Sequence, residues 1–119
     1  MTATARPVLL YDAECRFCRF AARIIARLDR RQRLAFLPLQ DEVAPALLPD
    51  LPEERRFASI HVVEPSGERR SAGEALVQIA RLLGLPAPDE VRHLYEPVAR
   101  RRGLLGKLVP DGSAPRRFP

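Results

Sequence analysis

The amino-acid sequence predicts an α/β domain with a mixed central sheet of about four strands flanked by helices, an extra C-terminal helix and a basic tail. Short apolar runs typical of strands alternate with stretches whose apolar residues recur at helical spacing. Their order is strand, helix, strand, helix, strand, strand, helix, helix, which favours a layered α/β arrangement. The chain has 119 residues, 46% of them hydrophobic, enough for the core of one domain.

The first predicted unit is a strand followed by an amphipathic helix. Pro7–Tyr11 is a continuous apolar run typical of a buried strand. The helix is expected from about Cys15 to Arg30, and five arginines between positions 16 and 30 form a polar stripe that we interpret as a solvated face. Its apolar face consists of Phe17, Phe20, Ala21, Ile24, Ile25 and Leu28.

The middle of the chain predicts three more strands and a short helix. Arg33–Leu39 is the second strand, and a helix around Glu42–Leu48 has a proline in its first turn, where proline is tolerated. Ser59–Glu64 is the third strand. Glu68–Arg70 follows turn-forming residues and is expected to pair back as a hairpin.

Two helices are expected next, each with a polar cap. Ser71 and Glu74 have the spacing of a capping box. Asp89 is expected to cap the last helix. The side chains expected to point inward from that last helix are Val91, Leu94, Tyr95 and Val98.

The order of elements is that of a minimal thioredoxin-like domain, which we expect to occupy residues 1–102. From residue 103 to 119 the chain loses its periodicity and is rich in Gly, Pro and basic residues. We therefore expect a loosely ordered basic tail. The residues through which it is expected to dock are Leu104, Leu105, Leu108 and Val109.

The charge and the cysteine content limit the classes of function that the sequence allows. The net charge is +5, and the positive excess lies in residues 1–33 and 99–119. With no apolar run before Val8 and no stretch long enough for a membrane span, we expect a cytoplasmic protein. Two cysteines are too few for a disulfide scaffold, and cytosolic disulfides are usually transient and catalytic.

The pair Cys15 and Cys18 is the only feature of the sequence that indicates a particular type of reaction. Two residues separate them, and they lie where the strand gives way to the helix. On a first helical turn this spacing brings two sulfur atoms close enough to bond. Helix geometry predicts an exposed Cys15, which attacks a substrate disulfide, and a sheltered Cys18, which then resolves the mixed disulfide.

Other interpretations of these residues remain open. Asp12 is either a proton acceptor for Cys18 or a residue that orders the turn. The cysteines are half of a zinc site only if His61 and His93 complete it, although these lie 32 positions apart on separate elements. Cys15 and Cys18 could also be inert core residues. His61 alternates with apolar neighbours and is interpreted as a half-buried histidine with satisfied hydrogen bonds.

The run Tyr11–Cys18 resembles the signature of the DCC-type thiol-disulfide oxidoreductase family, named for an Asp and two Cys that match Asp12, Cys15 and Cys18. Phe36–Gln40 and Ser71–Ala75 are also similar to family segments, and the resemblance covers about residues 7–102. It implies a thioredoxin-like fold and disulfide oxidoreductase activity, without naming a substrate. Typical thioredoxins have a cis-proline before the strand that faces the active site, whereas Phe57-Ala58-Ser59 contains no proline.

The sequence thus predicts a thiol-disulfide oxidoreductase acting through Cys15 and Cys18, with Asp12 as a third site residue. Expected partners are a protein or small-molecule disulfide or thiol and an electron-donor thiol system. No residue pattern indicates a cofactor or a metal. The alternative is a binding module with structural cysteines, in which basic residues contact an acidic protein or nucleic acid. Nucleic acid is disfavoured because no aromatic residues interleave with the basic ones.

Overall fold

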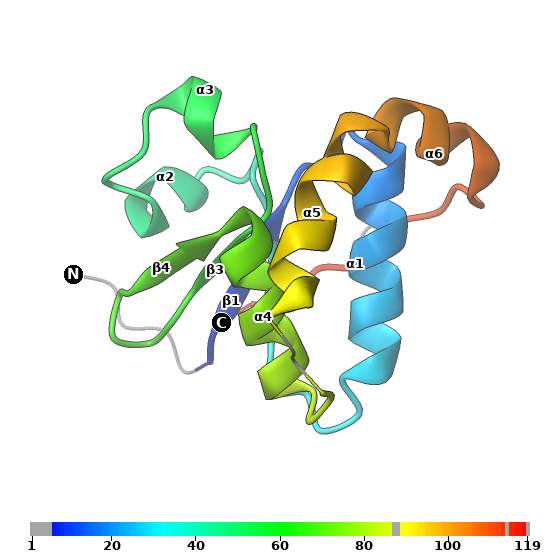
Figure 1. Ribbon diagram of the computed structural model, residues 1–119. Coiled ribbons are helices and arrows are strands. Elements are labelled where there is room, and N and C mark those ends of the chain that lie inside the picture. The colour runs from blue at the N-terminus through cyan, green and yellow to red at the C-terminus, as the bar shows by residue number, and fades with distance from the viewer. Residues whose placement is uncertain (1–5, 87–88, 114, 119) are drawn as a thin grey trace.

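The chain folds around a four-stranded mixed sheet, as predicted (Figure 1). The structure is a computed structural model that describes residues 6–86, 89–113 and 115–118. The sheet has the strand order β2-β1-β3-β4. Strand β1 (Val8–Tyr11) runs parallel to β2 (Ala35–Pro38) and antiparallel to β3 (His61–Val63), which pairs with β4 (Arg69–Ser71) in a hairpin. This sheet, flanked by helices, is compatible with the predicted thioredoxin-like fold.

Helices cover both faces of the sheet (Figure 1). The sequence had indicated four of them, and α3 and α6 are additions. Their bounds are α1 Arg16–Leu28, α2 Ala44–Leu47, α3 Glu53–Arg56, α4 Ala72–Leu82, α5 Glu90–Arg100 and α6 Arg102–Leu108. Helix α5 packs on α4, and α6 packs on α1.

The core consists of two clusters, one on each face of the sheet. Val8 and Leu10 of β1 point into a cluster with α2, whereas Leu9 and Tyr11 point into a cluster with α1 and α4. All four residues are buried, because side chains alternate between faces along a strand and both faces are covered. The unbroken apolar run of β1 therefore reflects its central place in the sheet.

The predicted capping box at the start of α4 is wrong. Ser71 occupies the N-cap position, but its side chain makes no capping bond. Ser71 is also the last residue of β4, directly opposite His61, and its hydroxyl oxygen lies 2.6 Å from Nδ1 of His61 and accepts from Arg69. The chain then turns into α4 through Ala72, whose φ of 54° is left-handed. The cross-strand neighbour thus takes the hydroxyl that the helix was expected to use.

The predicted cap of α5 is also wrong. Asp89 is itself in helical geometry and caps no backbone N–H with its side chain, which instead forms an ion pair with Arg92. Arg92 also pairs with Glu74 of α4, so these charges join α5 to α4. Two residues expected to point into the core, Leu94 and Val98, are 60% and 39% exposed.

The C-terminal region is more ordered than expected, because residues 102–108 form α6. Gly106 is buried against the first turn of α1, where an added Cβ would lie 3.4 Å from the backbone nitrogen of Phe17. Leu104 and Leu108, predicted to dock, are 60% and 75% exposed. Two glycines make α6 a weak helix by propensity, so its packing against α1 accounts for its presence.

The residues after α6 are also attached to the domain. Arg117 forms an antiparallel bridge with Phe36 on the outer edge of β2, and its guanidinium binds the buried carboxylate of Asp29 at 2.6 Å. The hydroxyl of Tyr11 donates to the carbonyl oxygen of Pro115. Backbone pairing and an ion pair thus hold the described part of this segment against the domain. The domain boundary at residue 102 stays a prediction.

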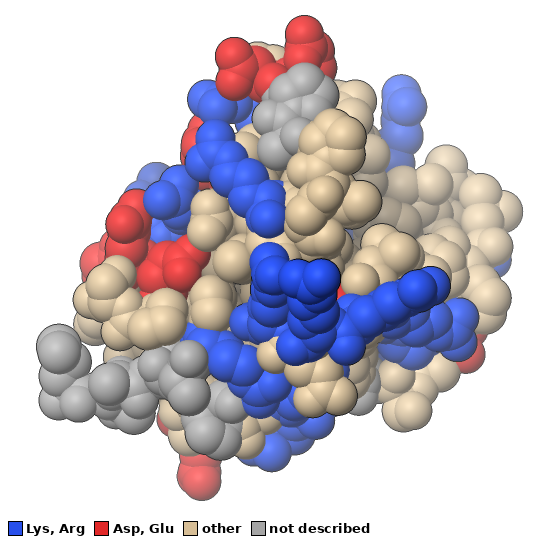
Figure 2. Space-filling view, turned by 90° about the horizontal axis from the view of Figure 1, so that it is seen from below, with Lys and Arg blue, Asp and Glu red and all other residues tan. Residues whose placement is uncertain are grey.

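Basic side chains gather on the face seen from below in Figure 2, at the end of the molecule where α1 finishes. Arg30, Arg31 and Arg33 line a groove of about 330 Å³ there. The cysteines lie at the opposite end of α1, about 20 Å away for a helix of 13 residues. In the described ranges, every helix is too short or too polar to span a bilayer.

Candidate active site

The two cysteines meet at the beginning of α1. Cys15 is the N-cap residue, and its sulfur accepts a hydrogen bond from the backbone N–H of Cys18 at 3.3 Å, as a cap side chain does at the third helical position. The thiol of Cys18 also donates to Cys15, with 2.7 Å between the two sulfur atoms. A disulfide bond measures about 2.05 Å, and both cysteines are free. The pair is therefore a dithiol whose sulfurs need little movement to bond.

A glutamine from the end of β2 holds the loop before the cysteines. One carboxylate oxygen of Asp12 accepts from the backbone N–H of Glu14 at 3.0 Å and from the side-chain amide of Gln40 at 2.6 Å. The amide oxygen of Gln40 in turn accepts from the backbone N–H of Ala13 at 2.9 Å. These bonds fix the turn that presents Cys15.

Arg19 joins this loop to the C-terminal segment. Its guanidinium donates to the carbonyl oxygen of Ala13 at 2.6 Å and forms an ion pair with Asp111 at 2.7 Å. Arg23, the next arginine of the stripe, donates to the carbonyl oxygen of Pro110. The prediction that the stripe is only a solvated face is therefore wrong for these two residues, because the C-terminal segment crosses them.

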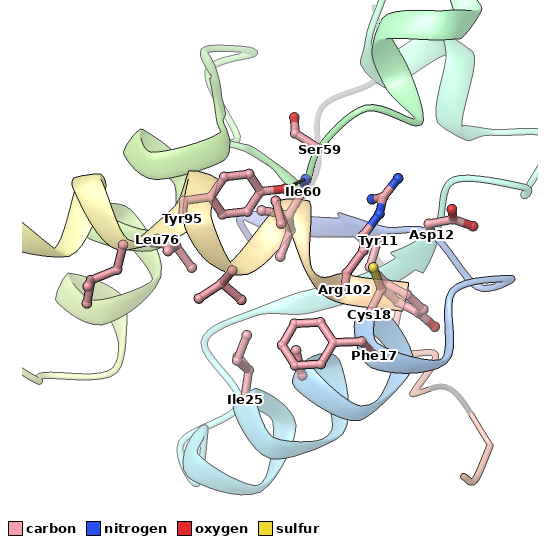
Figure 3. Close-up of a pocket in the computed structure, with 14 residues that line it drawn as sticks. Tyr11, Asp12, Phe17, Cys18, Ile25, Ser59, Ile60, Leu76, Tyr95 and Arg102 are labelled. Atoms are coloured by element: carbon pink, nitrogen blue, oxygen red, sulfur yellow. Dashed lines mark hydrogen bonds between the residues drawn. The ribbon is translucent and has the colours of Figure 1, made fainter. Parts of the chain in front are cut away.

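Cys18 forms part of the wall of an apolar cavity of about 180 Å³ (Figure 3). In Figure 3 the rings of Phe17 and Tyr95 enter from α1 and α5, and Cys18 lies at one end of the cavity beside Arg102. Leu94 and Val98 also face this space, which explains why they are partly exposed. The full lining is Tyr11, Asp12, Phe17, Cys18, Ala21, Ile25, Ser59, Ile60, Leu76, Leu94, Tyr95, Val98, Ala99 and Arg102.

These surroundings keep the proton on Cys18. Burial among apolar side chains, the hydrogen bond to Cys15 and the negative charge of Cys15 raise the pKa of Cys18 to about 12. The positive charge of Arg102 acts in the opposite direction, and the carboxylate of Asp12 adds a small further increase in this pKa. At neutral pH Cys18 is therefore a thiol.

Cys15 faces a different cavity, an open groove of about 370 Å³ between α1 and α6. Its lining is Glu14, Cys15, Arg16, Arg102, Gly103, Gly106 and Lys107. Cys15 is half-buried rather than exposed, because α6 packs over the first turn of α1. Cys18 is half-buried too, so the two thiols differ mainly in the cavity that each one faces.

The side chain of Tyr95 binds the backbone directly before β3. Its hydroxyl accepts from the N–H of Ile60 at 3.0 Å (Figure 3), and burial raises the pKa of this hydroxyl. Ser59 and Ile60 line the cavity beside Cys18. Typical thioredoxins have a cis-proline before this strand. Here no proline is present, and the N–H of Ile60 donates to the side chain of Tyr95 from α5.

His61 is buried with satisfied hydrogen bonds. Its Nε2 lies 2.8 Å from the carbonyl oxygen of Arg56, which can only accept, so Nε2 carries the proton and Nδ1 accepts from Ser71. Burial lowers the pKa of His61. Both nitrogens are thus engaged, and His93 lies exposed on α5. Within the described residues, no three His, Cys, Asp or Glu side chains gather as a metal site would require.

The structure brings all three predicted site residues to one end of α1 and adds Gln40, Tyr95 and Arg102 to them. In the sequence, Gln40 lies in a segment similar to the family, and its position directly after a strand end is its one signal. No pattern in the sequence distinguished Arg102 from Arg100 and Arg101.

A protein-family model described as DCC1-like thiol-disulfide oxidoreductase matches residues 9–107. The match covers most of the chain and includes both cysteines, so the chain belongs to this family. It also extends through most of α6, beyond the end at about residue 102 indicated by the sequence resemblance. No curated protein and no solved structure matches the chain.

Proposed function

We propose that the protein exchanges electrons between thiols and disulfides, with Cys15 as the attacking thiol and Cys18 as the resolving thiol. The observation that carries the proposal is the position of the two sulfurs. They lie 2.7 Å apart, yet one faces an open groove and the other an apolar cavity. Family membership supports the same class of chemistry.

In the first step, the thiolate of Cys15 attacks one sulfur of a substrate disulfide from the open groove. A bond forms between Cys15 and that sulfur, and the second substrate sulfur leaves as a thiolate that takes up a proton. Cys18 stays protonated during this step because its pKa is raised to about 12. Its S–H and backbone N–H both donate to Cys15 and orient that sulfur.

In the second step, Cys18 loses its proton and attacks the sulfur of Cys15. The bond between Cys15 and the substrate breaks, and the second substrate thiolate leaves and is protonated. Overall the dithiol of the protein gives two electrons and two protons to the substrate disulfide. A dithiol donor restores the pair by the same steps in reverse, and an oxidising partner would drive the cycle the other way.

We assign Asp12 a positioning role rather than proton transfer. Its carboxylate oxygen already accepts two hydrogen bonds, which hold the turn before Cys15. Its negative charge raises the pKa of Cys18, so it also helps that thiol to keep its proton. We place the cycle in the cytoplasm, where disulfides are usually transient and catalytic.

The test is a redox titration of the wild-type protein with Cys15→Ser and Cys18→Ser as matched variants. Equilibration in dithiol–disulfide buffers, acid quenching and mass spectrometry give the fraction that contains an intramolecular disulfide. We expect one reversible two-electron transition. A potential near that of thioredoxin, about −270 mV, would indicate a reductase, and one near −120 mV an oxidant.

The variants separate the two roles. Cys18→Ser should accumulate a mixed disulfide with a small disulfide substrate, whereas Cys15→Ser should form almost none. The oxidoreductase proposal is wrong if the folded wild-type protein forms no intramolecular disulfide. The assignment of roles is wrong if the two variants behave the other way round.

The alternative of a basic binding module has less support. Of the tail arginines invoked for it, Arg100, Arg116 and Arg117 form ion pairs with Glu96, Asp41 and Asp29. Their charges are therefore partly neutralised within the domain. This leaves less positive charge in the tail to attract an acidic partner.

A further inference from the structure

We propose that the groove beside Cys15 selects substrates by charge and binds a thiol or disulfide that carries a carboxylate close to its sulfur. The inference rests on the proposed function and adds a substrate class to it. Three observations lead to it: the charges that line the groove, the lack of hydrogen-bond or ion-pair partners for them among the described residues, and the packing of α6 beside the first turn of α1.

The lining is strongly basic. Arg16, Arg102 and Lys107 contribute three positive charges, against one negative charge from Glu14. Arg16 lies next to Cys15 in the chain, whereas Arg102 and Lys107 come from α6, almost 90 residues further on. An anion bound there would lie within reach of both helices, and guanidinium and ammonium groups are the usual partners of carboxylates.

Among the described residues, the three cations lack a hydrogen-bond or ion-pair partner. In the part of the chain that the structure describes, neither an ion pair nor a hydrogen bond engages the charged groups of Arg16, Arg102 or Lys107. Asp111, an acidic residue whose pKa Arg16 helps to lower, is paired with Arg19 instead. The groove therefore holds uncompensated positive charge at the reacting sulfur, ready for an external anion.

Two glycines give this groove its shape. An added Cβ at Gly106 would lie in ordinary van der Waals contact, 3.5 Å from the Cβ of Arg16, so α6 packs closely on the first turn of α1 at this point. Lys107, the next residue, lines the groove of Cys15. Gly103 has no atom within 4 Å of the position of an added Cβ, so this part of the groove is open. The glycines thus combine a close helix contact with room for a ligand.

The same charges act in the first chemical step. When the thiolate of Cys15 bonds to one sulfur of the anionic disulfide, the other sulfur leaves as a thiolate, and this negative charge develops beside three cations. Attraction also raises the encounter rate of an anionic substrate and weakens with added salt. A cationic substrate meets repulsion in the same place.

The test compares three small symmetrical disulfides with matched chemistry and different charge: dithiodipropionate (dianionic), hydroxyethyl disulfide (neutral) and cystamine (dicationic). The Cys18→Ser variant stops the reaction at the mixed disulfide, and intact mass measures its rate of formation. The quantity compared is the ratio of the dianionic to the dicationic rate. In the wild-type background, formation of the intramolecular disulfide gives the same ratio independently.

We expect this ratio to fall about two- to five-fold for each of Arg16→Gln, Arg102→Gln and Lys107→Gln, the effect of one partly exposed charge. Glu14→Gln, in the same groove, should raise it. Arg31→Gln, at the far end of α1, is the control and should leave the ratio unchanged. Raising the salt concentration to about 1 M should bring the wild-type ratio toward that of the triple variant, which combines these three substitutions of Arg16, Arg102 and Lys107.

A ratio that is the same in the wild-type protein and the triple variant overturns the charge selection. If all three disulfides then still react with Cys15, the oxidoreductase proposal stands and only the substrate class is wrong. If none of them forms a mixed disulfide with folded protein, both proposals are wrong.

Discussion

Cys15 and Cys18 lie 2.7 Å apart but face opposite kinds of surroundings. The groove of Cys15 is open and lined by Arg16, Arg102 and Lys107, whereas the cavity of Cys18 is apolar and lined by aromatic and aliphatic side chains. The comparison shows that the spacing of two cysteines makes a disulfide possible, but that their surroundings divide the work between them.

One region of the chain builds both environments. Helix α5 provides Tyr95 and Val98 to the cavity of Cys18, and α6 provides Gly106 and Lys107 to the groove of Cys15. Arg102, at the beginning of α6, lines both spaces and lowers the pKa of Cys18 against the larger effect of burial. Residues 90–108 thus contribute to both environments, together with residues of α1 and its preceding loop.

The largest expected difference is in alkylation of the reduced protein. With a pKa of about 12, Cys18 has roughly a thousandth of the thiolate that an ordinary thiol has at pH 8. Iodoacetamide should therefore modify Cys15 at least about 100-fold faster than Cys18. Peptide mass spectrometry after timed quenching measures both rates, with unfolded protein in urea as the control. Equal alkylation rates in the folded state would contradict the proposed difference between Cys15 and Cys18.

The pH dependence of the second step comes next. A raised pKa keeps the proton on Cys18, so its thiolate continues to increase with pH up to about 12. Between pH 8 and pH 10, the release of substrate from the mixed disulfide should then rise by more than the about 10-fold that a thiol of pKa 9 would give. Burial, the main cause of the shift, persists in the mixed disulfide. Rapid-quench measurements give the profile, and a plateau near pH 9 would contradict the assignment.

The two suggested roles of Asp12, positioning and proton transfer, predict different effects of its substitution on the two thiols. Asp12→Ala removes the acceptor for Glu14 and Gln40 and should cost about 1–2 kcal/mol of unfolding free energy in urea titrations. Asp12→Asn keeps an oxygen acceptor and removes the charge that raises the pKa of Cys18. Its second step should be unchanged or about twofold faster. A tenfold slower step would instead assign proton transfer to Asp12.

The smallest expected effect is that of Tyr95→Phe. This change leaves the N–H of Ile60 without its partner and should cost about 1 kcal/mol of unfolding free energy. The ring still fills the cavity, so the alkylation rate of Cys15 should stay the same. Urea unfolding and alkylation of the same sample check both statements. A changed Cys15 rate would mean that the cavity and the groove are coupled.

Prediction from the sequence worked where the signal was local. The apolar run of β1, the helical periodicity of α1 and the spacing of the cysteines are local patterns, and each located its element correctly. The face assigned to α1 was only partly right, because Ile24 and Leu28 are 37% and 53% exposed and the buried residue of the helix is Ala22. Prediction failed at Ser71 and Asp89, because a nearby side chain competed with the helix for each of these polar groups. It also missed α6, whose stability depends on contact with α1 rather than on its own composition.

By itself, the sequence determined the mixed α/β sheet and a dithiol at the start of a helix, because both follow from short-range periodicity and spacing. Only the tertiary structure decided how the two thiols differ. Burial and charge at a sulfur depend on whatever packs against it, and here those residues come from helices 75 to 90 positions further along the chain. Arg102 is the clearest case, since its position between both thiols exists only once α6 has docked on α1.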